Sequence, residues 1–164
     1  MDLSLRPFTS NDIGMCEKWA QNIVSEQYQS RYYPHSFNGK DFSSNEVLWS
    51  WYIIIVDREE VGTIWIEKKT VTDEVAILGI MLGRKDKFGK GIGREAIRQA
   101  IKKAQNQLGY RSVELNVRIE NTRAIACYQR CGFVIVREDI KIGKDGHEIP
   151  YLTMKLDLDG RCNN

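Results

Sequence analysis

The stretch from Ile80 to Gly93 constrains the fold of this chain more than any other part of its sequence. It begins with the apolar residues of a β-strand, passes through a basic turn punctuated by glycines, and then opens a helix. A helix start presents unpaired backbone N–H groups and a partial positive charge, which suit a phosphate. Glycines let the backbone approach a ligand closely and adopt angles that other residues resist. The sequence therefore predicts a site for a phosphorylated ligand at residues 88–94.

Basic residues are concentrated in and after this turn. Between Gly83 and Lys103, eight basic residues stand against two acidic ones, whereas the whole chain has a formal net charge of only +2 at pH 7. Part of this local excess is expected on a solvated helix face, and the part within the turn fits an anionic ligand. The small overall charge argues against a nucleic-acid-binding protein.

Size and composition favour one globular unit. The 164 residues contain no repeat, low-complexity tract or linker, so we expect a single domain over residues 1–164. Charged residues interrupt residues 1–20, and no run approaches the ~20 apolar residues of a membrane span, so we expect a cytoplasmic protein without membrane contact. Four cysteines lack metal-type spacing and disulfide-scaffold density, so no metal is expected. Cys127 and Cys131, one helical turn apart, are interpreted as packing residues rather than a redox pair.

The order of predicted elements indicates a mixed sheet. We expect strands at residues 3–7, 51–56, 61–67, 75–82, 112–117, 133–140 and 150–156. We expect helices after a cap at residues 10–12, between the glycine turn and Gly109, and over residues 122–130. Strands that first pair as hairpins and then alternate with helices indicate an α/β or α+β domain. The aromatic segment 28–42 could form a binding wall or a loop pinned to the core, and its role stays open.

Two common phosphate motifs do not fit the glycine turn. A Walker A loop needs Gly, four residues and then Gly-Lys-Ser/Thr, but five residues separate Gly83 from Gly89, and Lys90 is followed by Gly91. A dinucleotide-binding fingerprint needs Gly-x-Gly-x-x-Gly near a chain-opening strand. Here the glycines alternate up to Gly93, in the middle of the sequence.

Two segments resemble the GNAT superfamily of acyl-CoA N-acyltransferases. Residues 88–94 are similar to its pyrophosphate-binding segment Q/R-x-x-G-x-G/A, with Gly91 and Gly93 matching and Phe88 in the Gln/Arg position. One branch of the superfamily has an aromatic residue before Gly-Lys-Gly. Residues 121–133 are similar to the segment N-x-x-A-x-x-x-Y-x-x-x-G-F at every specified position. The resemblance covers residues 75–156 well and residues 1–70 by element order.

The resemblance implies a mixed, mostly antiparallel sheet of six to seven strands flanked by helices. Its central parallel strands, 75–82 and 112–117, would splay apart around acetyl-CoA. The pantetheine arm would pair with the backbone of the first strand, and the pyrophosphate would lie on amides of the glycine turn. The implied cofactor-binding residues are Ile80, Met81, Leu82, Phe88, Gly89, Lys90, Gly91, Ile92, Gly93, Arg94, Asn121 and Tyr128.

The reaction implied by the resemblance is direct attack of a primary amine on the thioester, with Tyr128 as the general acid. The base stays open. The positions at which relatives carry one are Ala76 and Leu78, which cannot titrate, so Glu74, Glu114 and water remain. The two histidines, at positions 35 and 147, are expected on the surface.

The acceptor is expected to be a polyamine or aminoglycoside-like small molecule or a protein N-terminus. The acidic residues at 57–60 and 73–74 could attract a cationic amine, although hairpin turns are usually charged. Trp51, Tyr52 and Trp65 are expected in the core rather than at the acceptor. The alternative function is a non-catalytic acyl-CoA-binding sensor or scaffold, which need not keep Tyr128. We expect a monomer or homodimer.

Overall fold

The computed structural model describes residues 1–22, 31–37 and 48–158. Its strands are β1 (Leu3–Pro7), β2 (Trp49–Val56), β3 (Glu59–Glu67), β4 (Val75–Leu82), β5 (Ser112–Arg118), β6 (Val134–Ile142) and β7 (Glu148–Asp157). Its helices are α1 (Ile13–Asn22), α2 (Ile92–Leu108) and α3 (Thr122–Arg130), with short 3₁₀ turns η1 (Ser10–Asp12) and η2 (Lys85–Lys87). Every strand and helix expected from the sequence is present, and their ends differ by two residues or fewer at most positions.

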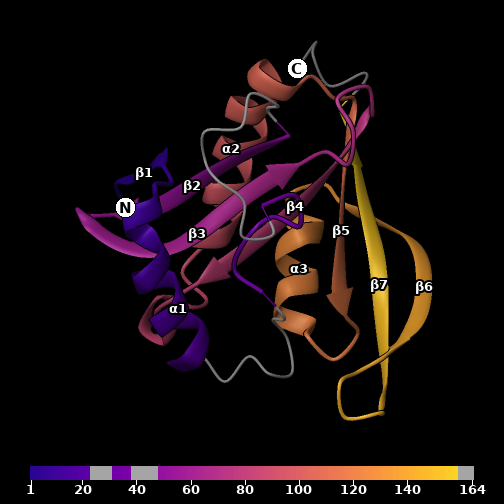
Figure 1. The fold of residues 1–164 in the computed structure, drawn as a ribbon. Helices are drawn as coiled ribbons and strands as arrows, with labels where there is room; N and C mark the ends of the chain where they lie inside the picture. Colours follow the sequence, from indigo (N-terminus) through magenta and orange to yellow (C-terminus); the bar gives the residue numbers. More distant parts are fainter. Residues whose placement is uncertain (23–30, 38–47, 159–164) are drawn as a thin grey trace.

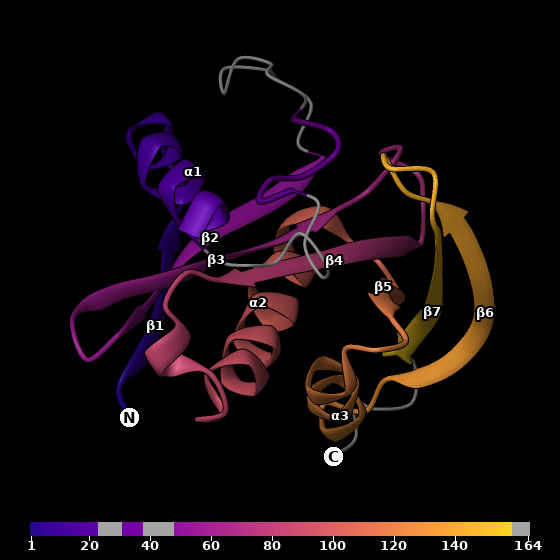
Figure 2. The same cartoon turned by 90° about the horizontal axis from the view of Figure 1, so that it is seen from below.

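The strands form one mixed sheet in the order β1-β2-β3-β4-β5-β7-β6 (Figure 1). All neighbouring strands are antiparallel except β4 and β5, which are parallel. Helix α1 covers one face of the sheet, and α2 and α3 cover the other (Figure 2). The predicted mixed, mostly antiparallel sheet flanked by helices is therefore confirmed. None of the described helices is long and apolar enough to cross a membrane.

The two parallel strands separate after a short paired stretch. Only three residues of β4, Val75–Ile77, pair with Ser112–Glu114 of β5. Beyond Ile77, β4 keeps its partner β3 up to Leu82, while β5 diverges from it toward β7 (Figure 1). The edge of β4 that faces β5 therefore leaves its backbone N–H and C=O groups without a strand partner, as an extended ligand requires. The splay predicted for these strands is confirmed.

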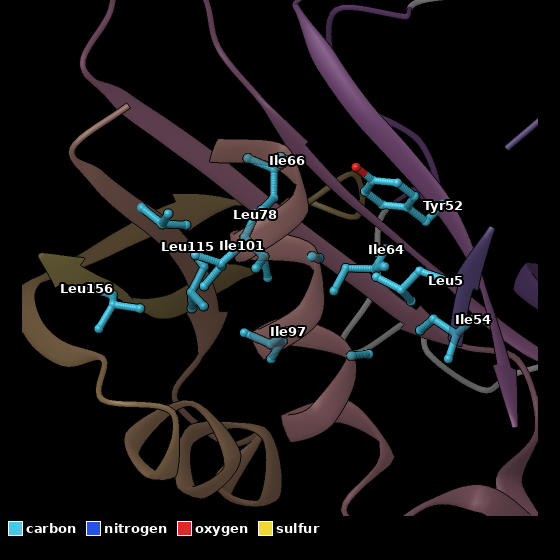
Figure 3. Close-up of a cluster of buried hydrophobic side chains, with 14 of the residues drawn as sticks. Leu5, Tyr52, Ile54, Ile64, Ile66, Leu78, Ile97, Ile101, Leu115 and Leu156 are labelled. Atoms are coloured by element: carbon cyan, nitrogen blue, oxygen red, sulfur yellow. The ribbon is translucent and has the colours of Figure 1, made fainter. Parts of the chain in front are cut away.

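The main core lies between the sheet and α2. Apolar residues recur on one face of this helix at the spacing of an amphipathic helix, and Ile97 and Ile101 point at the strands (Figure 3). They pack with Leu5 and Ile54 from the first half of the sheet and with Leu115 from β5. The core is therefore continuous across the splay.

The opposite face of the sheet has a smaller, aromatic core. Trp51 stacks on Phe8 with ring centroids 3.5 Å apart, and both pack with Cys16 of α1. Tyr32, Tyr33 and Phe37, the aromatic residues of the described segment 31–37, pack against this cluster. The described part of the aromatic segment is thus pinned to the core, and its remainder, 28–30 and 38–42, lies outside the described residues.

The start of α1 differs in detail from the prediction. The 3₁₀ turn at residues 10–12 is preceded by Thr9 as its N-cap, so the cap comes one residue earlier than expected. The Asp12 carboxylate accepts the Thr9 backbone N–H at 2.8 Å and binds Arg6 of β1 at 2.7 Å. This partly buried ion pair joins the 3₁₀ turn before α1 to the first strand.

Candidate active site

The glycine turn leads into α2 with the backbone angles that only glycine adopts readily. Gly89 and Gly91 have φ values of +74° and +81°, in the left-handed region. Gly91 is the N-cap of α2, and no side chain caps the helix start there. A Cβ at either glycine would meet no atom within 4 Å, so the space in front of the turn is open. The first amides of α2 are therefore available to a ligand.

A cavity of about 420 Å³ runs from the end of β4 across this turn to α3. Each residue predicted to bind the cofactor lines it, with the exception of Lys90, which is exposed outside the cavity. Residues of two further kinds, outside the set predicted to bind the cofactor, also line the cavity. The basic ones are Lys85, Lys87 and Arg123, and the apolar ones are Ile97, Ala124 and Cys127.

The residues from α3 are positioned by the cap of that helix. The Asn121 side-chain oxygen accepts the Ala124 backbone N–H at 3.3 Å, as expected for an N-cap residue. Two residues after this cap, the Arg123 guanidinium lies 4.5 Å from the centroid of the Phe88 ring. This contact joins α3 to the glycine turn across the cavity mouth. It also gives a structural reason for an aromatic residue at position 88.

A second cavity, of about 380 Å³, opens between β4 and β5 and extends under the segment 31–37. Both cavities share Ile80, Asn121 and Tyr128, so they meet at the splay. We call the first the cofactor cavity and the second the acceptor cleft. Trp65 is in the core, as expected, at 2% exposed, and His35 is exposed, as expected; both side chains also line the acceptor cleft. A Cβ at Gly79 would overlap the Trp65 ring, so glycine is needed there to give the indole its place.

Tyr128 lies where the two cavities meet. Its ring packs edge-on against Phe133, with centroids 6.1 Å apart, which holds it toward the sheet. Burial, and then the neighbouring Cys127 and Cys131 thiols, raise the pKa of the Tyr128 hydroxyl above its ordinary value. The phenol therefore keeps its proton at neutral pH, as a general acid must before the reaction.

Neither glutamate considered as the base lies in the acceptor cleft. Glu74, at the start of β4, has a side chain that is 67% exposed and pairs with Arg111 at 3.7 Å. Glu114 lies opposite Ile77, where the two strands still pair, and lines neither cavity. His147 is in the β6–β7 turn, where it pairs with Asp145. The described walls of the cleft contain no carboxylate.

Comparisons with known proteins point to one protein family. A family model described as an acetyltransferase (GNAT) domain matches residues 2–134. A mycothiol acetyltransferase from Jonesia denitrificans is 33% identical over 96 residues, which are 55% of this chain and 29% of that protein. The matched region therefore spans less than a third of that relative's length.

Solved structures share the fold at low sequence identity. The spermidine N-acetyltransferase from Vibrio cholerae, in complex with CoA and spermine, has a TM-score of 0.79 at 19% identity, covering 95% of both chains. An aminoglycoside acetyltransferase in complex with coenzyme A has a TM-score of 0.73 at 20% identity, covering 99% of this chain and 100% of the other. With the family model spanning most of the sequence, these findings show that the chain belongs to the GNAT acetyltransferase family.

Proposed function

We propose that this chain is an N-acetyltransferase that moves an acetyl group from acetyl-CoA to a primary amine. The observation that carries the proposal is the position of Tyr128, in the wall shared by two cavities. One cavity has the shape and charge for a phosphorylated carrier, and the other is open to a second substrate. A binding module would have no need of a protonated phenol at that junction.

The cofactor cavity fits acetyl-CoA in two respects. The unpaired edge of β4 beyond Ile77 matches the amide groups of an extended pantetheine arm, which would bind as a strand does. The amides of residues 89–94 would hold the pyrophosphate, and Lys85, Lys87 and Arg123 add positive charge in the same walls. Acetyl-CoA would supply the activated acetyl group.

The chemistry follows from where the two cavities meet. The amine nitrogen attacks the thioester carbonyl carbon, the carbon–sulfur bond breaks, and Tyr128 donates its proton to the departing thiolate. The amine loses a proton to solvent, and solvent returns a proton to the Tyr128 phenolate. Burial raises the pKa of Tyr128, and it would raise the pKa of a thiolate expelled beside it in the same way. Proton transfer from the Tyr128 phenol to the thiolate therefore stays feasible.

The acceptor must lose a proton before it attacks. We assign this step to water, because Glu74 and Glu114 line neither cavity. The cleft itself favours the neutral amine, since nearby cations disfavour an ammonium. Lys141, a primary ammonium in the cleft wall, shows the effect: partial burial and then the charges of Arg118 and Arg31 lower its pKa below the ordinary 10.5. An acceptor amine placed there would experience the same field.

The proposal is tested by CoA release from acetyl-CoA in the presence of a panel of primary amines, with the acetylated product identified by mass spectrometry. We expect CoA to be released in the presence of at least one class of amine and not in the absence of an amine. Acetyl-CoA binding is measured separately by calorimetry. Binding without turnover on any amine would favour the non-catalytic sensor. Absence of binding would overturn both functions.

A matched pair of variants tests the cofactor site. Asp and Asn at position 91 have similar size and impose similar backbone strain, since Gly91 has a φ of +81°. Only Gly91→Asp adds a negative charge where the pyrophosphate would lie. We expect Gly91→Asp to abolish acetyl-CoA binding and Gly91→Asn to weaken it less. Equal affinities in the two variants would contradict the assignment.

A further inference from the structure

The acceptor cleft is lined by cations. Its described walls contain Arg31, Lys69, Arg118 and Lys141, and they contain no aspartate or glutamate. These four residues come from the segment 31–37, the loop after β3, the end of β5 and strand β6. Charged residues from four separated parts of the chain are thus brought to one cavity of about 380 Å³.

The cofactor does not account for these charges. The phosphate-binding features, namely the glycine turn and Arg123, line the other cavity, on the side of the sheet covered by α2 and α3 (Figure 2). The acceptor cleft extends from the splay, where Tyr128 of α3 lines it, to the segment 31–37, which packs on the α1 side of the sheet. The four cations are therefore left to the second substrate.

One of the four is held in place by a buried carboxylate. Arg31 pairs with Glu67 at 3.6 Å and lies over the Trp65 ring, 5.5 Å from its centroid. The Glu67 side chain is 3% exposed, and it also accepts the backbone N–H groups of His35 and Ser36 at 2.8 and 3.2 Å. Glu67 is therefore occupied in fixing the segment 31–37, and it is not among the residues that line the cleft.

The histidine in the same segment adds a neutral donor. The Arg31 guanidinium donates to His35 Nδ1 at 2.6 Å, which places the imidazole proton on Nε2. Burial and the neighbouring charge of Arg31 lower the pKa of His35. A neutral imidazole therefore offers an N–H group at the cleft.

The other three cations make no ion pair with a carboxylate in the described part of the chain. Lys141 Nζ lies 5.9 Å from the centroid of the Tyr151 ring. Arg118 is the strand partner of Tyr151, so both cations lie next to this tyrosine. The pKa of Asp145, in the β6–β7 turn, is lowered mainly by hydrogen bonds from His147 and only lastly by the charge of Arg118. Asp145 is exposed and binds His147 at 3.0 Å. The side chains of Arg118 and Lys141 are therefore available to bind an anionic group of a ligand.

We propose that the acceptor is a small primary amine that also carries an anionic carboxylate or phosphate group, bound by Arg118 and Lys141 with support from Lys69 and Arg31. This inference rests on the proposed function and specifies its second substrate. Arginine and lysine are the side chains that bind carboxylate and phosphate oxygens through charge-assisted hydrogen bonds. A polyamine or an aminoglycoside would instead bring further positive charge into a cleft that already repels it.

Matched acceptors separate the anionic group from the amine. Glucosamine and glucosamine 6-phosphate have the same amine and differ in the phosphate, and 4-aminobutyrate and its amide differ in the carboxylate. We expect kcat/KM to be at least about tenfold higher for the anionic member of one pair, and the preferred pair distinguishes phosphate from carboxylate. This preference should weaken as ionic strength rises.

Variants assign the preference to the cleft. Arg118→Gln and Lys141→Gln should each raise KM for the acceptor with the anionic group about tenfold and leave KM for its partner without that group within about twofold. Lys103→Gln is the control, because Lys103 is exposed on α2 and lines neither cavity. The Lys141→Arg variant should keep most of the preference, since it keeps the charge.

The outcomes distinguish this inference from the function on which it rests. Faster acetylation of spermidine or an aminoglycoside than of any anionic amine would overturn the inference and leave the enzyme intact. An anionic preference that survives Arg118→Gln and Lys141→Gln would also overturn it. Acetyl-CoA binding without turnover on any amine would overturn the proposed function, and the inference with it.

Discussion

Tyr128 connects the sequence motif to the proposed chemistry at the scale of single residues. Replacing it with phenylalanine removes the proton that the leaving thiolate needs and keeps the ring that packs on Phe133. We expect kcat to fall about 100-fold or more, as for the loss of a general acid, while the Kd for acetyl-CoA changes less than about twofold. Steady-state CoA release and calorimetry measure the two quantities.

A second buried tyrosine provides the control for this variant. The Tyr110 hydroxyl donates to the Ile101 carbonyl oxygen at 2.6 Å, and Tyr110 lines neither cavity. Tyr110→Phe should lower thermal stability and leave kcat unchanged. If Tyr128→Phe retained full kcat, the general acid would have to be another group or water.

Motif spacing predicts a functional residue only where its role depends on the local backbone conformation. Gly89, Gly91 and the helix cap Asn121 could be predicted because their roles depend on local conformation. Arg118 and Lys141 carry no such signal, since each occupies an ordinary strand position in the sequence. Their common cleft arises from the pairing of β5 and β6 with β7, which no local pattern encodes.

At the scale of elements, the boundaries of β4 and α3 could be predicted because they depend on local pattern. The strand β4 is an uninterrupted apolar run, and α3 is bracketed by Asn121 and Gly132, so both match their predicted ranges. The position of Glu74 could not be judged in this way. Its side chain turns to Arg111 at the paired end of the two strands, away from the splay where the cavities meet.

The end of helix α2 depends on a lysine from outside the helix. Lys68, 3% exposed, donates from Nζ to the Leu108 and Gly109 carbonyl oxygens at 3.0 and 2.9 Å and to Val71 O at 2.6 Å. A cation is favourable at a helix C-terminus, where the last carbonyls lack partners inside the helix. Lys68→Met should lower the free energy of unfolding by about 2 kcal/mol, measured by urea denaturation.

An exposed lysine on the same helix gives the comparison for Lys68. Lys103→Met removes an equal charge from the surface of α2 and should change the free energy of unfolding by less than about 0.5 kcal/mol. Equal effects of the two substitutions would mean that the three carbonyls find other partners when Lys68 is lost.

At the scale of the whole molecule, the splay divides the sheet into two parts that share one core. The strands β1–β4 and the strands β5, β7 and β6 meet along three residue pairs, and α2 packs against the first part. The main core nevertheless includes Ile54 and Ile64 from one part and Leu115 and Met154 from the other. A continuous core of this kind predicts that the two parts unfold together.

The four tryptophans make this prediction measurable. All of them lie at or before position 65, so their fluorescence reports the first part of the sheet, whereas far-ultraviolet circular dichroism reports the whole chain. We expect the two thermal transitions to coincide. Acetyl-CoA at about 100 times its Kd should raise both midpoints together by about 5–10 °C, since ligand binding at that excess adds about 2.7 kcal/mol.

The joint shift tests the single domain and the location of the cofactor in one measurement. Gly91→Asp should unfold in one transition that acetyl-CoA does not move, because the ligand no longer binds. Separate fluorescence and dichroism midpoints would show two units that fold independently. A shift confined to the dichroism transition would place the ligand on the second part alone, whereas a cofactor held between β4 and β5 must stabilise both.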